Sequence, residues 1–278
     1  MIGSSVFVNL ALMTAVSIIF PVILAIWWVK TRNEKVSTIL IGAATWFVFA
    51  IVLESIPKSI LFNPALPTGK AVMGNAVLYT VFGCLLAGIF EETGRFVVFK
   101  TLLKNRTNKE TAISHGIGHG GFEAIFVMGI TGIQYMVYAS MINSGTFNEM
   151  IEQAKAMGTD TSAMEKLPEQ IMSFTLGNVF LNISERVFAV LLHIGLSILV
   201  FYAVKRSKIQ LYILSVALHA LFDVPAALYQ FGIIKEMYIV EIIFAVYATV
   251  FFILMIKQFY KKDDNPADIV IPGYVSEE

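Results

Sequence analysis

Seven apolar runs, each long enough to cross a bilayer as a helix, limit how this chain can fold more than any other feature. A helix needs about 20 apolar residues to span about 30 Å of hydrocarbon, and 57% of the 278 residues are hydrophobic while only 14% are charged. The runs occupy residues 6–29, 36–56, 72–99, 111–141, 174–204, 209–230 and 237–256. We therefore predict an all-α, polytopic membrane helix bundle, with a single transmembrane domain over residues 1–262 and a polar cytoplasmic tail over 263–278.

The charges between these runs indicate how the chain crosses the membrane. Lysine and arginine gather in alternate linkers, at residues 30–35, 100–109, 205–208 and 257–262. Because loops rich in these residues stay in the cytoplasm, we predict a multi-pass protein of the cytoplasmic (plasma) membrane with its N-terminus outside and its C-terminus inside. The 20 basic and 20 acidic residues balance, so the expected partners are membrane lipid and membrane proteins, with no nucleic acid.

The longest linker, residues 142–173, is predicted to be an external amphipathic segment. Phe147, Met150, Ile151, Ala154 and Met157 fall on one face at helical spacing. Ser162 and Glu165 have the spacing of a capping box that would start a second short helix. The segment could cover an active site as a lid or simply connect two spans, and the sequence favours the connector.

Ionisable residues inside the apolar runs indicate a function, because each charge at the centre of a span costs about 2.5 kcal/mol or more. The densest group is Glu91, Glu92 and Arg95 in the third run. The others are His115, His119, Glu123, Glu185, Arg186, His193, His219 and Asp223, together with Glu54 and Glu241. The last two lie close to outer ends, where a long side chain can reach the interface, and are given no role. At about 1.5 Å per helical residue, the Glu91, His119, His193 and His219 positions lie about 13–17 Å from the basic linkers. Four helices are therefore predicted to bring one carboxylate and three imidazoles to one level.

Helical phase places these side chains on shared faces, since residues four or seven apart point the same way. The shared faces carry Glu91 with Arg95, His115 with His119 and Glu123, Arg186 with His193, and His219 with Asp223. We therefore predict a catalytic or metal site made of Glu91, His119, His193 and His219. Supporting or oxyanion-side roles are assigned to Arg95, Glu123, Arg186 and Asp223, and a structural pairing to Glu185. His115 is left open between a place in the site and a structural role.

Missing residues exclude several intramembrane chemistries. The chain has no His-Glu-x-x-His motif, which excludes a zinc protease of the usual kind, and no Gly-x-Ser-Gly in a span, which excludes a rhomboid-like serine protease. Asp223 is its only aspartate inside an apolar run, so an aspartyl dyad of the presenilin type would lack its second member. A single cysteine, Cys84, excludes a multi-cysteine metal site. What remains is a water molecule activated by a carboxylate and histidines. Zinc could take part, because a glutamate with two or three histidines satisfies its tetrahedral coordination, and the same residues also suit metal-free chemistry.

Four stretches, in order along residues 91–223, carry a resemblance to known proteins. They are Glu91-Glu92-Thr93-Gly94-Arg95, His119-Gly-Gly-Phe122-Glu123, the segment from Arg186 to His193, and His219-Ala-Leu-Phe222-Asp223. In this order they resemble the four motifs of glutamic-type intramembrane proteases: first the paired-glutamate motif with its basic residue, and then the second motif of these enzymes. The third stretch resembles the arginine-and-histidine motif of PrsW, and the last is similar to the closing His-x-x-x-Asn/Asp motif. That group includes the type II CAAX prenyl endopeptidases, the PrsW proteases and the bacterial YhfC family, which the chain resembles most in overall look.

The resemblance implies an intramembrane endopeptidase that cuts a membrane-embedded or membrane-anchored protein. Glu91 would be the general base, and His119 or His193 would hold the attacking water. His219 and Asp223 would bind the developing oxyanion. Because the resemblance is to glutamic enzymes, it favours metal-free chemistry, with water reaching the site from the cytoplasm.

Glu92 is implied to act with Glu91 as a catalytic residue, and Glu92 and Arg95 would order the other groups. Arg95 has the spacing of the lysine in PrsW and not that of the CAAX arginine, so prenylated substrates are not implied. Two other functions stay open from the residues themselves. One is a proton- or cation-coupled transporter that uses the same groups as a relay, and the other is a non-enzymatic membrane or immunity protein.

Overall fold

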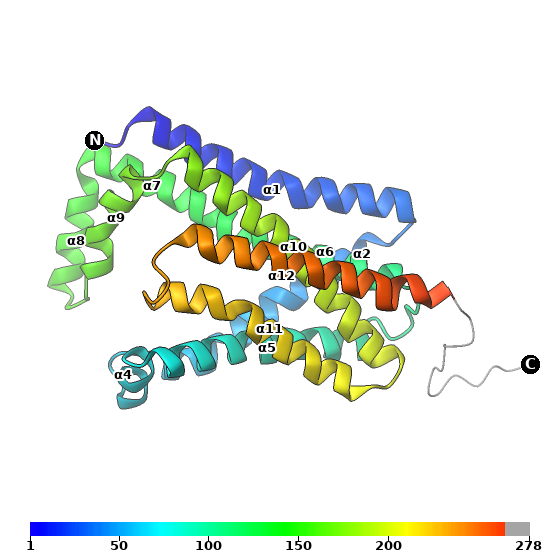
Figure 1. The fold of residues 1–278 in the computed structure, drawn as a ribbon. Helices are drawn as coiled ribbons and strands as arrows, with labels where there is room; N and C mark the ends of the chain where they lie inside the picture. The colour runs from blue at the N-terminus through cyan, green and yellow to red at the C-terminus, as the bar shows by residue number, and fades with distance from the viewer. Residues whose placement is uncertain (265–278) are drawn as a thin grey trace, which may run out of the picture. The chain divides into compact units, whose positions relative to one another are not determined.

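The computed structural model describes residues 1–264, and within this range the regular elements are all helical (Figure 1). Seven helical stretches of the described range are long and apolar enough to cross a membrane. They are α1 (Ser4–Arg32), α2–η1–α3 (Val36–Trp46, Phe47–Leu53, Ser55–Leu61), α5 (Ala76–Lys100), α6–η2–α7 (Glu110–Ala124, Ile125–Ile130, Thr131–Ser144), α10 (Leu176–Lys205), α11 (Ile209–Gln230) and α12–η3 (Met237–Met255, Ile256–Tyr260). The shorter helices are α4 (Pro67–Met73), α8 (Thr146–Ala156), α9 (Ser162–Met172) and η4 (Lys261–Asp264). The prediction of an all-α, multi-pass membrane protein is confirmed, and the predicted tail beyond Asp264 lies outside the described residues.

One predicted span begins too early. The apolar run from residue 72 is divided, because α4 ends at Met73 and α5 starts at Ala76. Asn75 separates the two helices, and its side-chain oxygen accepts hydrogen bonds from the backbone N–H groups of Val77 and Leu78 at 3.0 and 3.1 Å. An asparagine in this position satisfies N–H groups that have no partner within the helix, so α5 has a defined start.

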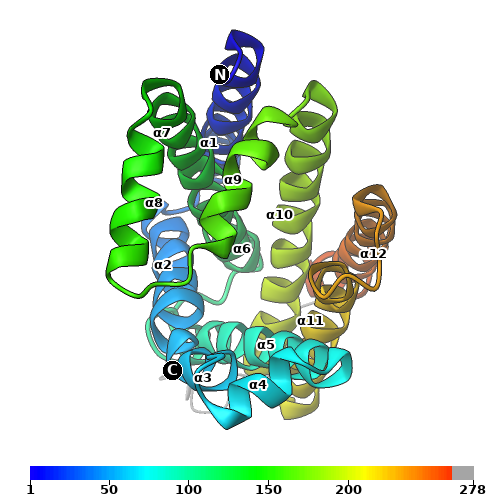
Figure 2. The same cartoon turned by 90° about the vertical axis from the view of Figure 1, so that its left-hand side faces the viewer.

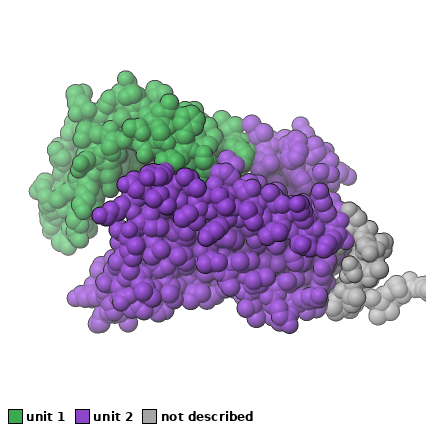
Figure 3. Space-filling view, viewed as in Figure 1, with its two compact units in different colours: residues 1–22, 124–186 green, residues 23–123, 187–278 purple. Residues whose placement is uncertain are grey.

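The chain divides into two compact units, drawn in different colours in Figure 3. Unit 1 comprises Met1–Val22 and Ala124–Arg186, and unit 2 comprises Ile23–Glu123 and the chain from Val187 onward. Because α1 and α10 each contribute residues to both units, the single transmembrane domain stays a prediction.

Unit 1 has its own apolar core between the start of α1, α7, α9 and the start of α10. Its buried members are Ile2, Val6, Leu10, Met13, Ala139, Ile171 and Val179. The chain start is also held by polar contacts, since the Ile2 N–H donates to the Asn143 side chain at 2.6 Å and the Asn143 amide donates to the Ile2 carbonyl at 3.0 Å.

The linker between α7 and α10 belongs to unit 1 and forms the two helices α8 and α9. Phe147, Ile151 and Ala154 are buried, so the predicted apolar face of α8 is confirmed for these three residues. Met150 is half-buried, and Met157, just past the end of α8, is exposed. The predicted capping box is displaced by one residue, because α9 is preceded by Thr161, whose hydroxyl donates to Glu165 Oε1 at 3.0 Å. Lys155 of α8 lies 3.1 Å from the same carboxylate, and its hydrogen bond lowers the pKa of Glu165 below the ordinary value.

Unit 2 contains the helical segments that carry Glu91, His119, His193 and His219. Helices α5 and α11 of this unit pack along each other and lie side by side in Figure 2. A glycine permits this approach, since a Cβ atom on Gly88 would lie 2.7 Å from the backbone oxygen of Val216. Small residues let membrane helices pack closely, where van der Waals contact must replace the hydrophobic effect.

Four basic linkers meet at one end of unit 2, which we call the basic end. The α5–α6 linker connects them: Arg106 donates to the Ser37 hydroxyl at the start of α2 at 2.9 Å, and Lys205 at the end of α10 donates to the Thr107 carbonyl at 3.0 Å. Lys109 lies 4.7 Å above an aromatic ring of η3. The alternation of charge along the sequence thus corresponds to one end of the helices, and the assignment of that end to the cytoplasm stays a prediction.

Candidate active site

Three charged side chains of α5 point into the interior of unit 2. Arg95 and Glu92 are fully buried and form an ion pair. The Arg95 Nη2 atom also lies 2.6 Å from His193 Nδ1 and 3.7 Å from Glu91 Oε2. Arg95 was predicted to share a helix face with Glu91, and the structure gives it the closer contact with Glu92, three residues away. Buried charges need such partners, since removing an ion from water costs several kcal/mol.

Glu91 lies at the meeting point of four helices. Its Oε2 atom is 2.8 Å from His119 Nε2 on α6, 4.0 Å from His193 Nδ1 on α10, and 4.0 Å from His219 Nε2 on α11. All four side chains are buried. The structure therefore brings together the carboxylate and the three imidazoles that depth and helical phase had grouped.

Two further carboxylates hold the outer nitrogens of the histidines. His219 Nδ1 lies 2.7 Å from Glu92 Oε1, and His193 Nε2 contacts Glu123. The tautomer of His193 follows from its partners: the Arg95 guanidinium can only donate, so Nδ1 accepts and Nε2 carries the proton toward Glu123. These carboxylate–histidine pairs fix the orientation of both rings.

Glycines on α6 allow its close approach to α10, and this approach brings His119 to His193. A Cβ atom on Gly116 would lie 2.5 Å from Ile194 Cα, and one on Gly120 would lie 2.9 Å from His193 Cβ. The ring centroids of the two histidines are 5.0 Å apart. The α6 helix stays regular across these glycines, so close packing, and not local unwinding, explains them.

Two predicted members of the group have other surroundings. His115 is buried one turn from His119, where its Nδ1 lies 3.2 Å from the Ser197 hydroxyl and its Nε2 lies 3.3 Å from the Thr45 hydroxyl. A structural role accounts for those contacts. Arg186 belongs to unit 1 and forms an ion pair with the adjacent Glu185, as the predicted structural role of Glu185 required.

Asp223 stands where the site meets a cavity. Its Oδ2 atom lies 3.7 Å from His219 Nε2, and its side chain is 35% exposed while that of His219 is only 4% exposed. The cavity of about 340 Å³ lies between α3, α5 and α11 and is lined by Lys58, Phe62, Tyr79, Gly83, Cys84, Ala87, Asp223, Ala226, Ala227 and Gln230. Its small lining residues Gly83, Ala87, Ala226 and Ala227 lie on α5 and α11 and were not among the predicted site residues.

The cavity opens on the side of the site away from the basic end. Toward the basic end, His115 is stacked against Phe99 with ring centroids 4.7 Å apart, and the neighbouring Thr45 and Ser197 are buried. The cavity thus lies on the opposite side of the site from the basic end, and the entry of water from the basic end stays a prediction. The rise per residue gives the depth of a side chain along its helix, but it does not tell which side of the site is packed with other side chains.

The amino-acid sequence of this chain matches one known protein family. A family model described as "YhfC intramembrane metalloprotease" matches residues 16–244. The chain is 37% identical over 263 residues to the "Uncharacterized membrane protein YhfC" of Bacillus subtilis (strain 168), covering 94% of this chain and 100% of that protein. The chain belongs to the YhfC family. No solved structure matches it.

The family description raises the question of whether these residues fit a metal ion. Ligand atoms of Glu91, His119 and His193 lie within 4.8 Å of one another. The separations of Glu91 Oε2 from His119 and His193, 2.8 and 4.0 Å, lie on either side of the roughly 3.4 Å between the ligands of tetrahedral zinc. The Nε2 atom of His119 faces Glu91, while its Nδ1 atom is buried and has no hydrogen-bond partner among the described residues, so the outer partner that usually orients a ligating imidazole is missing from this histidine. One carboxylate and two imidazoles are a donor set that zinc accepts, so the residues of this YhfC-family site fit the ion.

Proposed function

We propose that this YhfC-family protein is a zinc-dependent intramembrane endopeptidase. The observation that supports the proposal best is the buried set of Glu91, His119 and His193, whose ligand atoms converge within 4.8 Å from three membrane-spanning helices. Such a group is costly inside a bilayer and is usually kept for chemistry. Within the YhfC family, the description of the matching family model as a metalloprotease supports the same reaction.

Glu91, His119 and His193 would hold the zinc ion, and the carboxylates around them would set their orientation. A zinc ion supplies Lewis-acid chemistry that makes a water molecule a good nucleophile at neutral pH. Glu123 keeps His193 in the tautomer whose Nδ1 carries no proton, and the Arg95 guanidinium, which lies 2.6 Å from Nδ1, would have to turn away for that atom to bind the ion. Arg95 adds positive charge at the same centre, 3.7 Å from Glu91 Oε2, where negative charge develops as the peptide carbonyl is attacked.

Asp223 and His219 would act on the substrate side. Asp223 is the carboxylate at the border of the cavity, so it is placed to accept the proton of the attacking water and to return it to the leaving amine as the C–N bond breaks. His219, whose Nδ1 lies 2.7 Å from Glu92, presents Nε2 to the same space and, with both ring nitrogens protonated, would donate a hydrogen bond to the oxyanion. Glu92 is thus a positioning residue in the proposal, and Glu91 changes from general base to metal ligand.

The cavity lined by Ala87, Ala227 and Asp223 is the proposed entrance for the substrate. A peptide bond within a helix has its carbonyl engaged in a hydrogen bond, so the substrate must present a locally unfolded segment. The small side chains along α5 and α11 leave room for an extended backbone. A membrane-embedded or membrane-anchored protein whose scissile segment lies near the border of the bilayer fits this arrangement.

Cleavage by purified protein tests the proposal, with Glu91→Gln, Asp223→Asn and the control Glu185→Gln assayed beside the wild type on a set of single-span membrane proteins. We expect Glu91→Gln to lose both bound zinc and cleavage. Asp223→Asn should keep zinc and lose about 100-fold or more in rate, the usual range for a missing general base. Glu185→Gln should keep both.

Other results would assign the site differently. If Glu91→Gln retains zinc but is inactive, Glu91 is the general base and not a ligand. If the wild type cleaves none of the substrates but drives proton-coupled flux in liposomes that depends on Glu91, the buried groups serve a transporter.

A further inference from the structure

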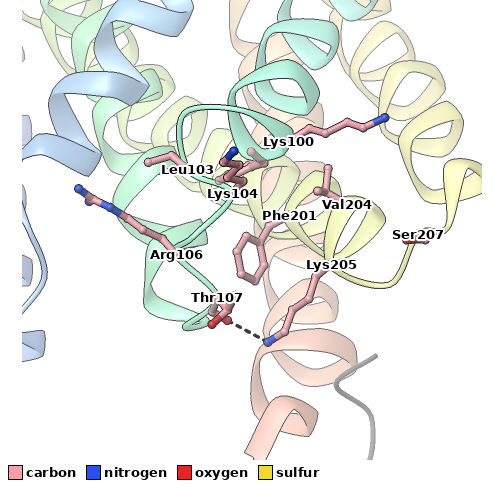
Figure 4. Close-up of a pocket in the computed structure, with 10 residues that line it drawn as sticks. Lys100, Leu103, Lys104, Arg106, Thr107, Phe201, Val204, Lys205 and Ser207 are labelled. Atoms are coloured by element: carbon pink, nitrogen blue, oxygen red, sulfur yellow. Dashed lines mark hydrogen bonds between the residues drawn. The ribbon is translucent and has the colours of Figure 1, made fainter. Parts of the chain in front are cut away.

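Two cavities of unit 2 differ in how well they define a ligand. The cavity at the basic end has a volume of about 270 Å³ and lies between the end of α5, the α5–α6 linker and the end of α10 (Figure 4). Figure 4 shows the side chains of Lys100, Arg106 and Lys205 pointing in different directions, so a single ligand would not contact all three. The cavity of about 340 Å³ that contains Asp223 has instead a wall of small side chains beside a proposed catalytic group. It therefore limits the shape of what it can bind.

Gly83 of this wall is a helix-interior glycine that packing does not explain. Glycine in the middle of a helix is destabilising relative to alanine. At Gly88, five residues along α5, a Cβ atom would lie 2.7 Å from the Val216 backbone oxygen, so close packing requires a glycine there. At Gly83 the nearest atom would be Phe62 Cζ at 3.8 Å, an ordinary contact, and the backbone is helical. What Gly83 provides is open space on the cavity side.

The packing of α5 against α11 places Gly83 level with Asp223. Helix α5 ends and α11 begins at the basic end, so the two run in opposite directions. Gly88 lies between Val216 and Ala220, because its Cβ would be 2.7 Å from the oxygen of the first and 3.3 Å from the nitrogen of the second. Since both helices rise about 1.5 Å per residue, five residues away from the basic end lead to Gly83 on α5 and to Asp223 on α11. Both residues line the same cavity.

Other polar groups around this cavity are paired with one another. Lys58 Nζ lies 2.7 Å from the buried Glu54 carboxylate, and the Tyr79 hydroxyl donates to the Gln230 side-chain oxygen at 3.2 Å. The side chains next to Gly83 in the wall are those of Phe62, Cys84 and Ala87. The group that fills this part of the cavity is therefore apolar.

We propose that the space beside Gly83 receives a large apolar side chain of the substrate, that of the residue after the scissile bond. The inference rests on the proposed endopeptidase function, in which Asp223 returns a proton to the leaving amine. The nitrogen of that amine belongs to the residue after the scissile bond, and its Cα is only about 1.46 Å away, so this side chain begins beside Asp223. A glycine lets a ligand approach the backbone closely. Gly83 is thus a specificity-determining residue and takes no part in the chemistry.

A set of labelled single-span peptides tests the inference. Each has an alanine segment where its apolar span ends, and one phenylalanine is moved through this segment position by position, while the parent peptide keeps alanine throughout. Binding to zinc-free protein is measured by fluorescence anisotropy, and cleavage by zinc-loaded protein is located by mass spectrometry. The variants are Gly83→Ala and Gly83→Leu. The matched control is Val81→Leu, which enlarges a side chain on the exposed side of the same helix.

We expect the wild type to cut directly before the phenylalanine, with kcat/KM about 100-fold above that for the parent peptide, since one methylene in an apolar pocket already changes this ratio about 10- to 200-fold. Gly83→Ala should lower the preference about 10-fold, Gly83→Leu should abolish it, and Val81→Leu should keep it. A Cβ atom at residue 83 would make only an ordinary contact with Phe62. Gly83→Ala therefore carries the test even if the larger side chain prevents folding.

The subsite and the proposed proteolysis can fail separately. Cleavage with an unchanged preference in both Gly83 variants, or with an equal loss in Val81→Leu, would overturn the subsite and leave the endopeptidase intact. Tighter binding of a phenylalanine peptide that Gly83→Leu abolishes, with no peptide cleaved, would support the subsite and contradict the endopeptidase. Neither binding nor cleavage by the wild type would overturn both.

Discussion

Removing Arg95 is predicted to destabilise the protein more than removing any other single polar side chain of the site. Its guanidinium is completely buried, forms an ion pair with Glu92, and lies 2.6 Å from His193 Nδ1 and 3.7 Å from Glu91 Oε2. Replacing it with Met keeps the volume of the side chain but leaves the Glu92 carboxylate uncompensated. Breaking a buried pair in this way costs about 3–5 kcal/mol.

A double substitution separates the electrostatic cost from a general loss of packing. Glu92→Gln/Arg95→Met removes both charges, and replacement of a complete buried pair is often close to neutral. We therefore expect the double variant to recover most of the stability lost by Arg95→Met, although its cleavage activity stays low because Glu92 no longer holds His219.

Unfolding in a detergent–denaturant titration, followed by tryptophan fluorescence, measures both changes. The reasoning would be refuted if Arg95→Met unfolded within about 1 kcal/mol of the wild type, which is the scale of an exposed ion pair. It would also be refuted if the double variant were less stable than the single one, since the two charges would then not compensate each other.

Three further predictions concern packing, the cavity and the external linker. Gly120→Ala should lower the free energy of unfolding by about 1–3 kcal/mol, the usual cost of overpacking, because its Cβ would lie 2.9 Å from a carbon of His193. The control in the same detergent–denaturant titration is Gly177→Ala, whose Cβ would have its nearest neighbour at 3.4 Å. Ala87→Trp places a large side chain in the cavity and should abolish cleavage without loss of zinc, whereas Val81→Trp on the exposed side of the same helix should leave cleavage unchanged. Equal cleavage rates for the wild type and both variants would exclude the cavity as the entrance for the substrate. The pKa of Glu165 is lowered by the ion pair with α8, so that contact is complete above the ordinary pKa of glutamate and is lost as the pH falls through the lowered value. Hydrogen exchange of α9, corrected for intrinsic rates, should therefore rise in acid for the wild type but not for Glu165→Gln, and an identical rise in both would contradict the contact.

The spans and the convergence of Glu91 with three histidines could be predicted because both depend on position along a helix. Apolar run length fixes where a helix crosses the bilayer, and a constant rise per residue fixes the relative depth of side chains on different helices. Neither inference requires knowledge of side-chain conformation. Glu91, His119, His193 and His219 therefore appear together as expected.

The detailed pairing could not be predicted, because residues three and four apart share a helix face equally well. Arg95 is compatible by spacing with either glutamate, and only the position of the neighbouring helices gives Glu92 the closer contact. His115 is in phase with His119, yet one turn of displacement places it beside Thr45 and Ser197. Such contacts depend on which hydroxyl groups the adjacent helices present.

The two cavities could not be predicted from the sequence for a similar reason. A cavity is the volume that side chains from several helices leave unfilled, and the sequence of any one helix does not contain that quantity. The small residues near Asp223 and the lysines of the basic end were each visible in the sequence. Their arrangement around two separate spaces required the packing of α5 against α11 and α10.

The zinc content of purified, proteolytically active protein tests the central claim most directly. If Glu91, His119 and His193 form a metal site, active wild-type protein should contain about one zinc ion per chain, in line with a single three-ligand catalytic site. Removal of the ion by a chelator should abolish cleavage, and restoring zinc should recover it. Full cleavage by protein that contains no metal would contradict the account and assign the same buried residues to metal-free chemistry.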